Sequence, residues 1–254
     1  MSRLLELDNV RAGFGANTVL HGCSYHVDEG EIAAVLGLNG AGKSVSLKVA
    51  AGLIPAWSGK IVFAGEDATS MSVEERVARG MGHVPQGRQV FADLTVEENL
   101  RLGAYVLRRR DRSRYPGALE HAFDRFPLLA ERRSQLAGTM SGGQQAMLAV
   151  ARALMSEPKL LVVDEPSAGL APVAVQELFD TLVAVHASGV TILMVEQNVT
   201  LSLKIAHRVH IMQRGQIVYE GSVDELDNEK VAGYLGIGRL LSKPVAAAKK
   251  GRKR

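Results

Sequence analysis

Three short, nearly continuous apolar runs dominate the pattern of hydrophobic and polar positions along the chain. They lie within residues 31–36, 160–163 and 190–195. A strand with one solvated face would alternate between apolar and polar residues. Strands of a parallel sheet are buried on both faces and are therefore apolar throughout. The pattern predicts an α/β protein with these runs at the centre of its sheet.

Helical spacing of apolar residues characterises the middle of the chain. Residues 96–107 follow Thr95, a favourable N-cap, and carry two acidic residues in the first turn, where the helix dipole favours them. Residues 118–133 predict a second helix. Because this stretch lies between strand-rich segments, we interpret residues 93–150 as an inserted helical subdomain.

Shorter patterns predict the remaining elements. Residues 4–10 alternate loosely and predict an edge strand, and residues 24–27 predict another short strand. Residues 108–117 are rich in arginine and predict a basic loop, either a solvated connection or a contact with anionic lipid or an acidic partner. Further predictions are helices at 45–50, 172–186, 198–206 and 223–234, strands within 58–65 and 81–87, and a hairpin of 208–213 and 216–219.

Charge is distributed unevenly along the chain. The last twelve residues hold six of the 30 Lys and Arg and none of the 27 Asp and Glu, which leaves 24 basic against 27 acidic residues elsewhere. The body is therefore slightly acidic, which argues against a nucleic-acid-binding surface covering it. We expect a single domain over residues 1–242, with a catalytic core from residues 1–92 and 151–242, and a disordered basic tail at 243–254.

Cysteine usage and hydropathy indicate a compartment. Cys23 is the sole cysteine, so the chain forms no internal disulfide, and we expect this thiol to be buried as a small apolar group. The first residues lack the apolar stretch of a signal peptide, and no apolar run approaches the length of a membrane span. These features predict a cytoplasmic protein. The seven histidines show no metal-ligand spacing.

Residues 37–44 match the phosphate-binding pattern G-x-x-x-x-G-K-[ST], the Walker A loop, without a substitution. A predicted strand precedes them and a predicted helix follows, so glycine backbone N–H groups would surround a phosphate at a helix N-terminus. Lys43 would reach the β- and γ-phosphates, and the Ser44 hydroxyl would hold Mg²⁺. This context disfavours the alternative, a chance glycine-rich turn. The predicted nucleotide-binding residues are Gly37, Asn39, Gly40, Ala41, Gly42, Lys43, Ser44 and Val45.

The apolar run at 160–163 ends in two carboxylates, Asp164 and Glu165. An apolar strand followed by Asp is the Walker B pattern, in which the end of the strand places a carboxylate at Mg²⁺. Glu165 is a candidate general base for a water molecule beside the γ-phosphate. A buried strand followed by a turn-forming acidic pair is the alternative, and the Walker A loop upstream favours the metal site.

Two further segments are weaker candidates for nucleotide contacts. Ser141 is a good N-cap before a helical run, and Gly142 and Gly143 leave the backbone N–H groups of that helix start unobstructed. Phe14 stands between two glycines. It suits stacking on a nucleotide base, worth about 1–3 kcal/mol, as well as it suits ordinary packing.

Taken together, these motifs resemble the nucleotide-binding subunits of ABC transporters over almost the whole chain. Gln86 matches the Q-loop, residues 140–144 are a variant of the LSGGQ signature, and residues 167–170 resemble the D-loop. Phe14 corresponds to the aromatic residue of the A-loop. The resemblance implies a P-loop NTPase core, in which a mixed sheet carries helices on both faces, with an N-terminal antiparallel β subdomain and an inserted α-helical subdomain.

The resemblance also implies a mechanism and partners. Two subunits would close head to tail around two ATP molecules with Mg²⁺, and Ser141, Gly142 and Gly143 of each would contact the γ-phosphate bound by the other. ATP binding would favour the closed dimer, and hydrolysis would favour reopening. Gln86 would contact Mg²⁺ and connect the γ-phosphate to a groove that receives a membrane subunit.

One departure from the family pattern narrows the resemblance. Gln197 stands where most of these ATPases carry a switch histidine, and glutamine cannot carry an imidazolium charge, so hydrolysis would be slower. With the neighbouring motifs, this resembles the LivF branch of branched-chain amino-acid importers, and ATPases for urea uptake are an alternative. The branch implies a second ATPase, as a heterodimer or a homodimer, two membrane permeases, and a periplasmic or lipid-anchored binding protein. The chain would lie at the inner face of the plasma membrane.

Two other classes of function are less well supported. A soluble ABC ATPase acting on ribosomes or nucleic acid is favoured by the basic tail alone. A regulatory nucleotide-binding partner with little turnover is suggested by Gln197. The sequence does not identify the transported substrate, because substrate contacts would lie on other subunits.

Overall fold

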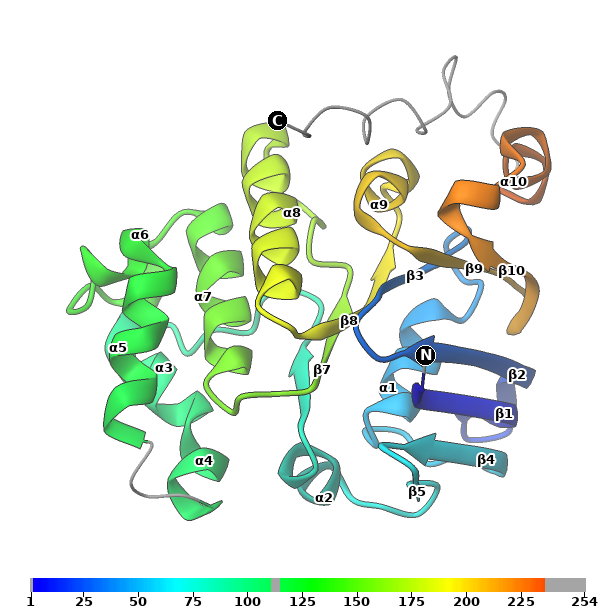
Figure 1. The fold of residues 1–254 in the computed structure, drawn as a ribbon, viewed down its shortest axis with the longest axis horizontal. Helices are drawn as coiled ribbons and strands as arrows, with labels where there is room; N and C mark the ends of the chain where they lie inside the picture. The colour runs from blue at the N-terminus through cyan, green and yellow to red at the C-terminus, as the bar shows by residue number, and fades with distance from the viewer. Residues whose placement is uncertain (1, 111–114, 236–254) are drawn as a thin grey trace, which may run out of the picture.

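The computed structural model describes residues 2–110 and 115–235 (Figure 1). Its strands are β1 (Arg3–Phe14), β2 (Asn17–Asp28), β3 (Ile32–Leu36), β4 (Ser58–Phe63), β5 (Glu66–Asp67), β6 (Met81–Val84), β7 (Leu160–Asp164), β8 (Thr191–Glu196), β9 (Arg208–Gln213) and β10 (Gln216–Ser222). Its helices are α1 (Lys43–Ala50), α2 (Val73–Ala78), α3 (Val96–Gly103), α4 (Tyr105–Arg110), α5 (Tyr115–Arg125), α6 (Pro127–Ala130), α7 (Gly142–Leu154), α8 (Pro172–Ala187), α9 (Val199–Ile205) and α10 (Asn228–Leu235), with 3-10 turns η1 (Ala137–Thr139) and η2 (Val223–Glu225). The predicted tail at 243–254 lies outside the described residues.

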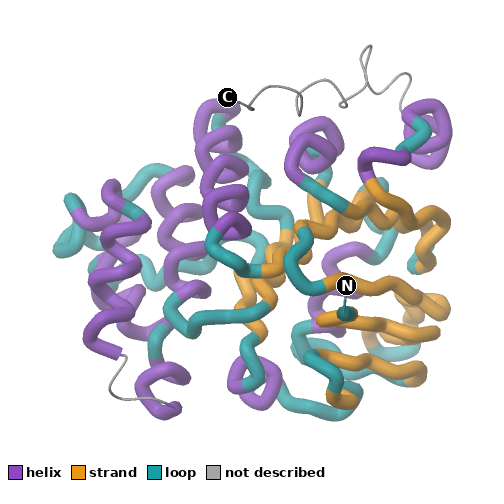
Figure 2. Tube along the Cα trace, in the orientation of Figure 1, coloured by secondary structure: helices purple, strands orange, loops and turns teal. Residues whose placement is uncertain are grey.

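In these described ranges the strands form two sheets, which Figure 2 shows in orange. The larger has six strands in the order β10-β9-β3-β8-β7-β6 and is parallel except for β10, which pairs antiparallel with β9. The smaller has four antiparallel strands in the order β2-β1-β4-β5. Helices α8 and α9 cover one face of the larger sheet, and α1 lies between its other face and the smaller sheet (Figure 1).

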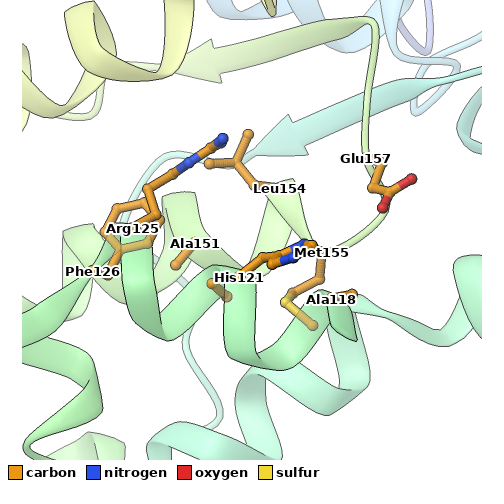
Figure 3. Close-up of a pocket in the computed structure, with 9 residues that line it drawn as sticks. Ala118, His121, Arg125, Phe126, Ala151, Leu154, Met155 and Glu157 are labelled. Atoms are coloured by element: carbon orange, nitrogen blue, oxygen red, sulfur yellow. The ribbon is translucent and has the colours of Figure 1, made fainter. Parts of the chain in front are cut away.

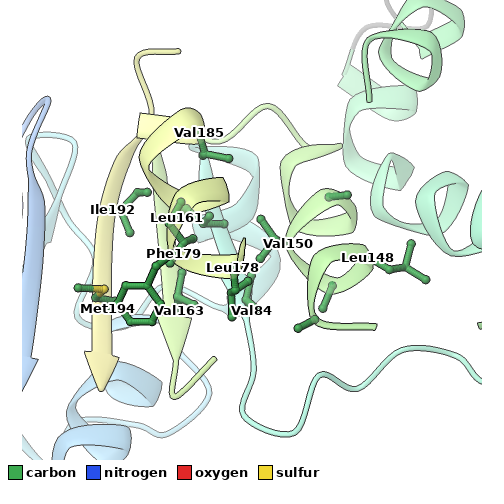
Figure 4. Packing of buried hydrophobic residues seen from close by; sticks show 14 of the residues in the cluster. Val84, Leu148, Val150, Leu161, Val163, Leu178, Phe179, Val185, Ile192 and Met194 are labelled. Carbon is green, nitrogen blue, oxygen red and sulfur yellow. The ribbon is translucent and has the colours of Figure 1, made fainter. Parts of the chain in front are cut away.

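The apolar runs of the sequence become strands that separate two hydrophobic cores. Every residue of β3, β7 and β8 is buried. Because side chains alternate along a strand, Ala34 and Leu36 of β3 enter the core under α8, whereas Ala33 and Val35 enter the core around α1. In Figure 4, Phe179 of α8 points toward the sheet within the first of these cores. Burial on both faces explains the lack of polar alternation.

Helices α3 to α7 form a separate group beside the larger sheet (Figure 1). Thr95 caps α3 and Ser141 caps α7, each through a reciprocal capping box, as their sequences predict. Helix α7 continues to Leu154 and contacts both α3 and α8, so it joins this group to the sheet. None of the helices in the described ranges combines the length and the apolar character that a bilayer crossing requires.

The prediction of an edge strand at residues 4–10 is wrong. β1 extends to Phe14 and lies between β2 and β4, with hydrogen-bonded partners on both sides. The short strand predicted at 24–27 is the end of the 12-residue strand β2, which forms a hairpin with β1. Both errors arise because bulges interrupt the alternation of apolar residues, and because β4 is distant from β1 in sequence.

The helices predicted at 96–107, 118–133 and 223–234 are each divided in the structure. Gly103 is the last residue of α3. It packs closely against α7, because a Cβ there would lie 2.1 Å from the Arg152 carbonyl oxygen. Pro127 ends α5 and begins α6, because proline cannot donate the backbone hydrogen bond of a continuous helix.

The basic loop predicted at 108–117 is also wrong at both ends. α4 continues through Arg110 and α5 begins at Tyr115. Residues 111–114 lie outside the described residues.

Candidate nucleotide-binding site

The Walker A loop leads from β3 directly into α1 and leaves the start of that helix without a side-chain cap. Gly42 is the N-cap residue, has a φ of +104° and makes no side-chain cap hydrogen bond, in contrast to the capped start of α7. Gly37 is required by a close approach, because a Cβ there would lie 2.4 Å from the Met212 carbonyl oxygen. The first N–H groups of α1 are therefore available to an anion.

Lys43 lies inside this loop and is only 4% exposed. Its Nζ donates hydrogen bonds to the carbonyl oxygens of Gly37 at 3.0 Å and Leu38 at 3.3 Å, and lies 3.9 Å from Glu165 Oε1. Burial lowers the pKa of the ammonium group, while the nearby carboxylates act in the opposite direction. The side chain is thus held by backbone oxygens, with its charge directed at the loop that would bind phosphate.

Asp164, at the end of β7, is fully buried, and neither of its carboxylate oxygens has a hydrogen-bond partner. Burial raises its pKa, and Ser44, Lys48 and Lys43 only partly oppose this. A buried carboxylate without partners is costly unless a ligand satisfies it. Carboxylate and hydroxyl oxygens are the ligand type that Mg²⁺ takes, so Asp164 and Ser44 fit this ion.

Glu165 is fixed by groups from two segments of the chain. Its backbone has a φ of +45°, an unusual conformation for a residue with a side chain, and its N–H donates to the Val195 carbonyl oxygen at 2.9 Å. Its Oε2 accepts hydrogen bonds from Gln86 Nε2 at 2.9 Å and from Gln197 Nε2 at 2.8 Å. The loops after β6 and β8 therefore hold the carboxylate beside Lys43.

These residues converge on one pocket of about 450 Å³. The pocket is lined by Val19, Asn39, Gly40, Ala41, Gly42, Lys43, Ser44, Val45, Gln86, Glu165 and Gln197. All except Val19 are among the residues predicted from the sequence. Gly37 and Asp164 are absent from this lining, but Gly37 bonds to Lys43, and Asp164 lies next to Glu165 in the chain.

Besides Gly37 and Asp164, four predicted residues are absent from the pocket lining. Phe14 ends β1 and is 56% exposed. The Ser141 hydroxyl accepts a hydrogen bond from Gln144 N of its own helix. Gly142 lies against the Arg88 guanidinium, since a Cβ there would be 2.8 Å from Nη1, and Gly143 lies against α8 at Ala174. The signature segment therefore does not line the pocket formed by the phosphate loop of the same chain.

Sequence reasoning missed three residues of the site region. Val19 belongs to β2, and no local pattern indicated its position at the pocket. Arg88 was overlooked because its contacts lie in segments distant in sequence. Glu196 carried a usable signal, because it is a carboxylate at the end of an apolar strand, as is Asp164.

A second pocket of about 130 Å³ lies between α5 and α7 (Figure 3). His121 and Arg125 of α5 and Glu157 after α7 are its ionisable side chains, and the rest of its lining is mostly apolar. None of the predicted site residues lines it.

Comparisons with known proteins agree with this geometry. The family model of the ABC transporter matches residues 20–168. The chain is 42% identical to the high-affinity branched-chain amino acid transport ATP-binding protein BraG of Pseudomonas aeruginosa, covering 92% of this chain and all of that protein. It is 35% identical to the probable branched-chain amino acid transport ATP-binding protein LivF of Archaeoglobus fulgidus, covering 89% and 96% of the two chains.

A solved structure gives the same result for the fold. A nucleotide-free ATP-binding cassette from an ABC transporter superposes with a TM-score of 0.79 at 29% identity, over 92% of this chain and 96% of that one. The predicted fold class, a P-loop ABC-ATPase core, is confirmed. The chain belongs to the ABC transporter family, as one of its ATP-binding subunits that hydrolyse ATP to drive transport.

Proposed function

We propose that this chain binds Mg·ATP in the pocket around Lys43 and energises an importer of branched-chain or other hydrophobic amino acids. The observation that carries the site assignment is the convergence of an uncapped helix start, a buried lysine and an unpartnered buried aspartate on one side of the sheet. Each of these features is unfavourable in isolation, and a triphosphate with its metal ion would satisfy all three.

Different residues of the pocket would bind the phosphates, hold the metal ion and accept the proton of the attacking water. Lys43 and the N–H groups of α1 would bind the β- and γ-phosphates, while Ser44 and Asp164 would hold Mg²⁺, which reduces the negative charge of the phosphates. Glu165 is positioned to accept a proton from the attacking water. Gln86 and Gln197 orient its carboxylate. The proposed contact of Gln86 with Mg²⁺ would require its amide group to turn from Glu165.

A second ATPase subunit would complete each site. Ser141, Gly142 and Gly143 lie outside the pocket of their own chain, at the start of α7. The Ser141 hydroxyl caps Gln144 N, so the N–H groups of Gly142 and Gly143 would remain for a phosphate bound by a partner, either a copy of this chain or a homologue.

The substrate class follows from the relatives. BraG and LivF are named as branched-chain amino acid transport proteins and match this chain over almost their whole length. By this reasoning the chain works at the cytoplasmic face of the membrane, bound to two permease subunits. A binding protein would deliver the substrate to these permeases.

An apolar groove suits the contact with a permease. It has a volume of about 530 Å³, and Phe91, Leu102 and Tyr105 in its lining are each about half exposed. The Arg152 guanidinium stacks on Phe91 at 5.1 Å and donates to the Gln89 carbonyl oxygen at 2.8 Å. The groove is thereby connected to the loop that carries Gln86.

Nucleotide binding and hydrolysis by the purified protein test the site. Wild type should hydrolyse Mg·ATP, and Glu165→Gln should retain ATP and accumulate as a dimer in size-exclusion chromatography. Failure of wild type to bind ATP above background would refute the proposal.

Uptake measurements test the substrate class separately. A strain that lacks this chain should lose uptake of labelled leucine, and wild type but not Lys43→Ala should restore it. Loss of urea uptake with normal leucine uptake would assign the chain to a urea importer instead.

A further inference from the structure

The D-loop, residues 167–170, is held by a buried carboxylate at the end of β8. Glu196 is the last residue of β8 and is 1% exposed. One of its carboxylate oxygens accepts a hydrogen bond from Ser167 N at 3.0 Å, and the other accepts one from Ser167 Oγ at 2.9 Å. Both donors of the same D-loop residue are therefore satisfied by one side chain.

The same carboxylate also holds the turn that follows β8. Glu196 Oε2 accepts hydrogen bonds from the backbone N–H groups of Gln197 at 2.9 Å and Asn198 at 3.3 Å. The Gln197 side chain, in turn, donates to Glu165 Oε2 at 2.8 Å. A continuous series of hydrogen bonds therefore runs from the D-loop through Glu196 and Gln197 to the candidate general base.

In the part of the chain that the structure describes, Glu196 makes no close ion pair, although its charge opposes, from a longer distance, the lowering of the Lys43 pKa that burial causes. Within the described residues, no Lys, Arg or His nitrogen lies within 4.0 Å of its carboxylate. A buried carboxylate is costly, and four hydrogen bonds offset that cost only while both loops keep their positions. An amide could not replace it, since its NH₂ group would face a donor at one of the two oxygen positions.

A second anchor attaches the D-loop to the segment that follows β6. Arg88 Nη2 donates to the Gly169 carbonyl oxygen at 3.2 Å. Arg88 lies two residues after Gln86, the other glutamine that donates to Glu165 Oε2. Each of the two segments that orient Glu165 is thus also attached to the D-loop.

We propose that Glu196 is a positioning residue for ATP hydrolysis: it couples the position of the D-loop to the orientation of Gln197 and hence of Glu165. The inference rests on the proposed role of Glu165. It predicts that movement of the D-loop alters the geometry of the general base, with nucleotide binding at Lys43 left intact.

Kinetics of Glu196→Gln test the proposal. The variant should lose about ten-fold or more in kcat, as expected from the loss of hydrogen bonds to a charged group, with KM for ATP changed less than about three-fold. Ser167→Ala should lose less, because the backbone bond of Ser167 remains. Glu31→Gln is the matched control: Glu31 is a buried carboxylate remote from the pocket, and its loss should leave kcat unchanged.

Hydrogen exchange supplies a readout independent of activity. Glu196→Gln should accelerate amide exchange at residues 167–170 and 197–199, with exchange in 43–50 unchanged. A uniform acceleration across the chain, or an unchanged kcat together with unchanged exchange, would overturn the proposal.

A double variant tests the route through Gln197. If Glu196 acts through Gln197, then Glu196→Gln should reduce kcat little further in a Gln197→Ala background, whereas additive losses would overturn the coupling. Absence of hydrolysis in wild type would contradict the proposed function, and the exchange experiment would still decide the role of Glu196.

Discussion

Strand β3 begins beside one group of charged residues and leads at its other end into a second group, and the two groups are satisfied differently. At its start, the amino-edge cluster comprises Asp28, Glu31, Arg208 and Glu220. Arg208 Nε lies 3.2 Å from both Glu31 oxygens, and its Nη2 lies 3.0 Å from Asp28 Oδ2. At the far end, the carboxyl-edge cluster comprises Lys43, Asp164 and Glu165, in which Asp164 has no hydrogen-bond partner.

The contrast separates a stabilising arrangement from a functional one. Each carboxylate of the amino-edge cluster has Arg208 as a partner within the chain, so none of these charged groups is left for a ligand to satisfy. Charges of the carboxyl-edge cluster remain incompletely satisfied, and Glu165 also has a strained backbone. Ligands of open α/β sheets bind at the carboxyl ends of the strands. The carboxyl edge therefore lowers the stability of the folded chain, and a ligand bound there would raise it again.

The largest expected effect comes from Asp164→Asn. Hydrolysis of ATP should fall by at least about a thousand-fold, because the metal ion loses its carboxylate ligand. The free energy of unfolding without nucleotide should stay the same or rise by about 1 kcal/mol, since an uncharged amide is cheaper to bury than a carboxylate. Urea unfolding and a phosphate-release assay measure the two quantities. A large loss of stability would contradict the functional interpretation of this edge.

Glu31→Gln should lower stability and leave hydrolysis unchanged, the reverse of the result expected for Asp164→Asn. Removing the carboxylate leaves Arg208 with fewer partners, so the free energy of unfolding should fall by about 2–3 kcal/mol. Activity per folded molecule should stay at the wild-type level. Arg79→Met, which removes an exposed ion pair with Glu66, is the control and should cost less than about 0.5 kcal/mol. If Glu31→Gln impaired hydrolysis, the two edges would not be independent.

The sequence predicted the carboxyl edge better than the amino edge, for a physical reason. The Walker A loop and the strand that ends at Asp164 are local patterns, because each consists of consecutive residues whose backbone or burial does the chemistry. The partners Glu31 and Arg208 are 177 residues apart. No local pattern identifies such a pair, since each residue alone is compatible with an exposed position.

The same distinction explains what was missed within the site. Glu196 reaches Ser167 across 29 residues, and Arg88 reaches Gly169 across 81. These contacts depend on β6, β7 and β8 lying side by side, which is a property of the sheet order. The placement of β1 between β2 and β4 was missed for the same reason.

A pH experiment sharpens the comparison at the amino edge. His210 is fully buried beside Tyr25, His26, Arg208 and Glu220, and burial lowers its pKa to about 3. Below about pH 6.5 the unfolded chain binds a proton that the folded chain does not bind, so stability falls as the pH falls toward 3. Between pH 6.5 and 5, wild type should lose about 1–2 kcal/mol more than His210→Phe.

Unfolding at several pH values measures this difference. Other titrating groups, including His83 with a pKa lowered to about 4, are common to both proteins and cancel in the comparison. Equal pH slopes for wild type and His210→Phe would mean that His210 gains its proton without unfolding.

The smallest expected effect comes from Gln197→His, which adds a titratable cation to the carboxyl-edge cluster. The glutamine is a neutral donor, whereas an imidazolium would place a positive charge beside the γ-phosphate and stabilise the charge that develops there by about 1 kcal/mol more. We therefore expect kcat to rise by about five-fold and to acquire a dependence on pH near 6.5. Gln197→Asn, which stays uncharged and is shorter by one methylene, is the control and should not gain activity. A rise of more than about a hundred-fold from a barely measurable rate would mean that the glutamine holds the natural chain near inactivity, as in a regulatory partner.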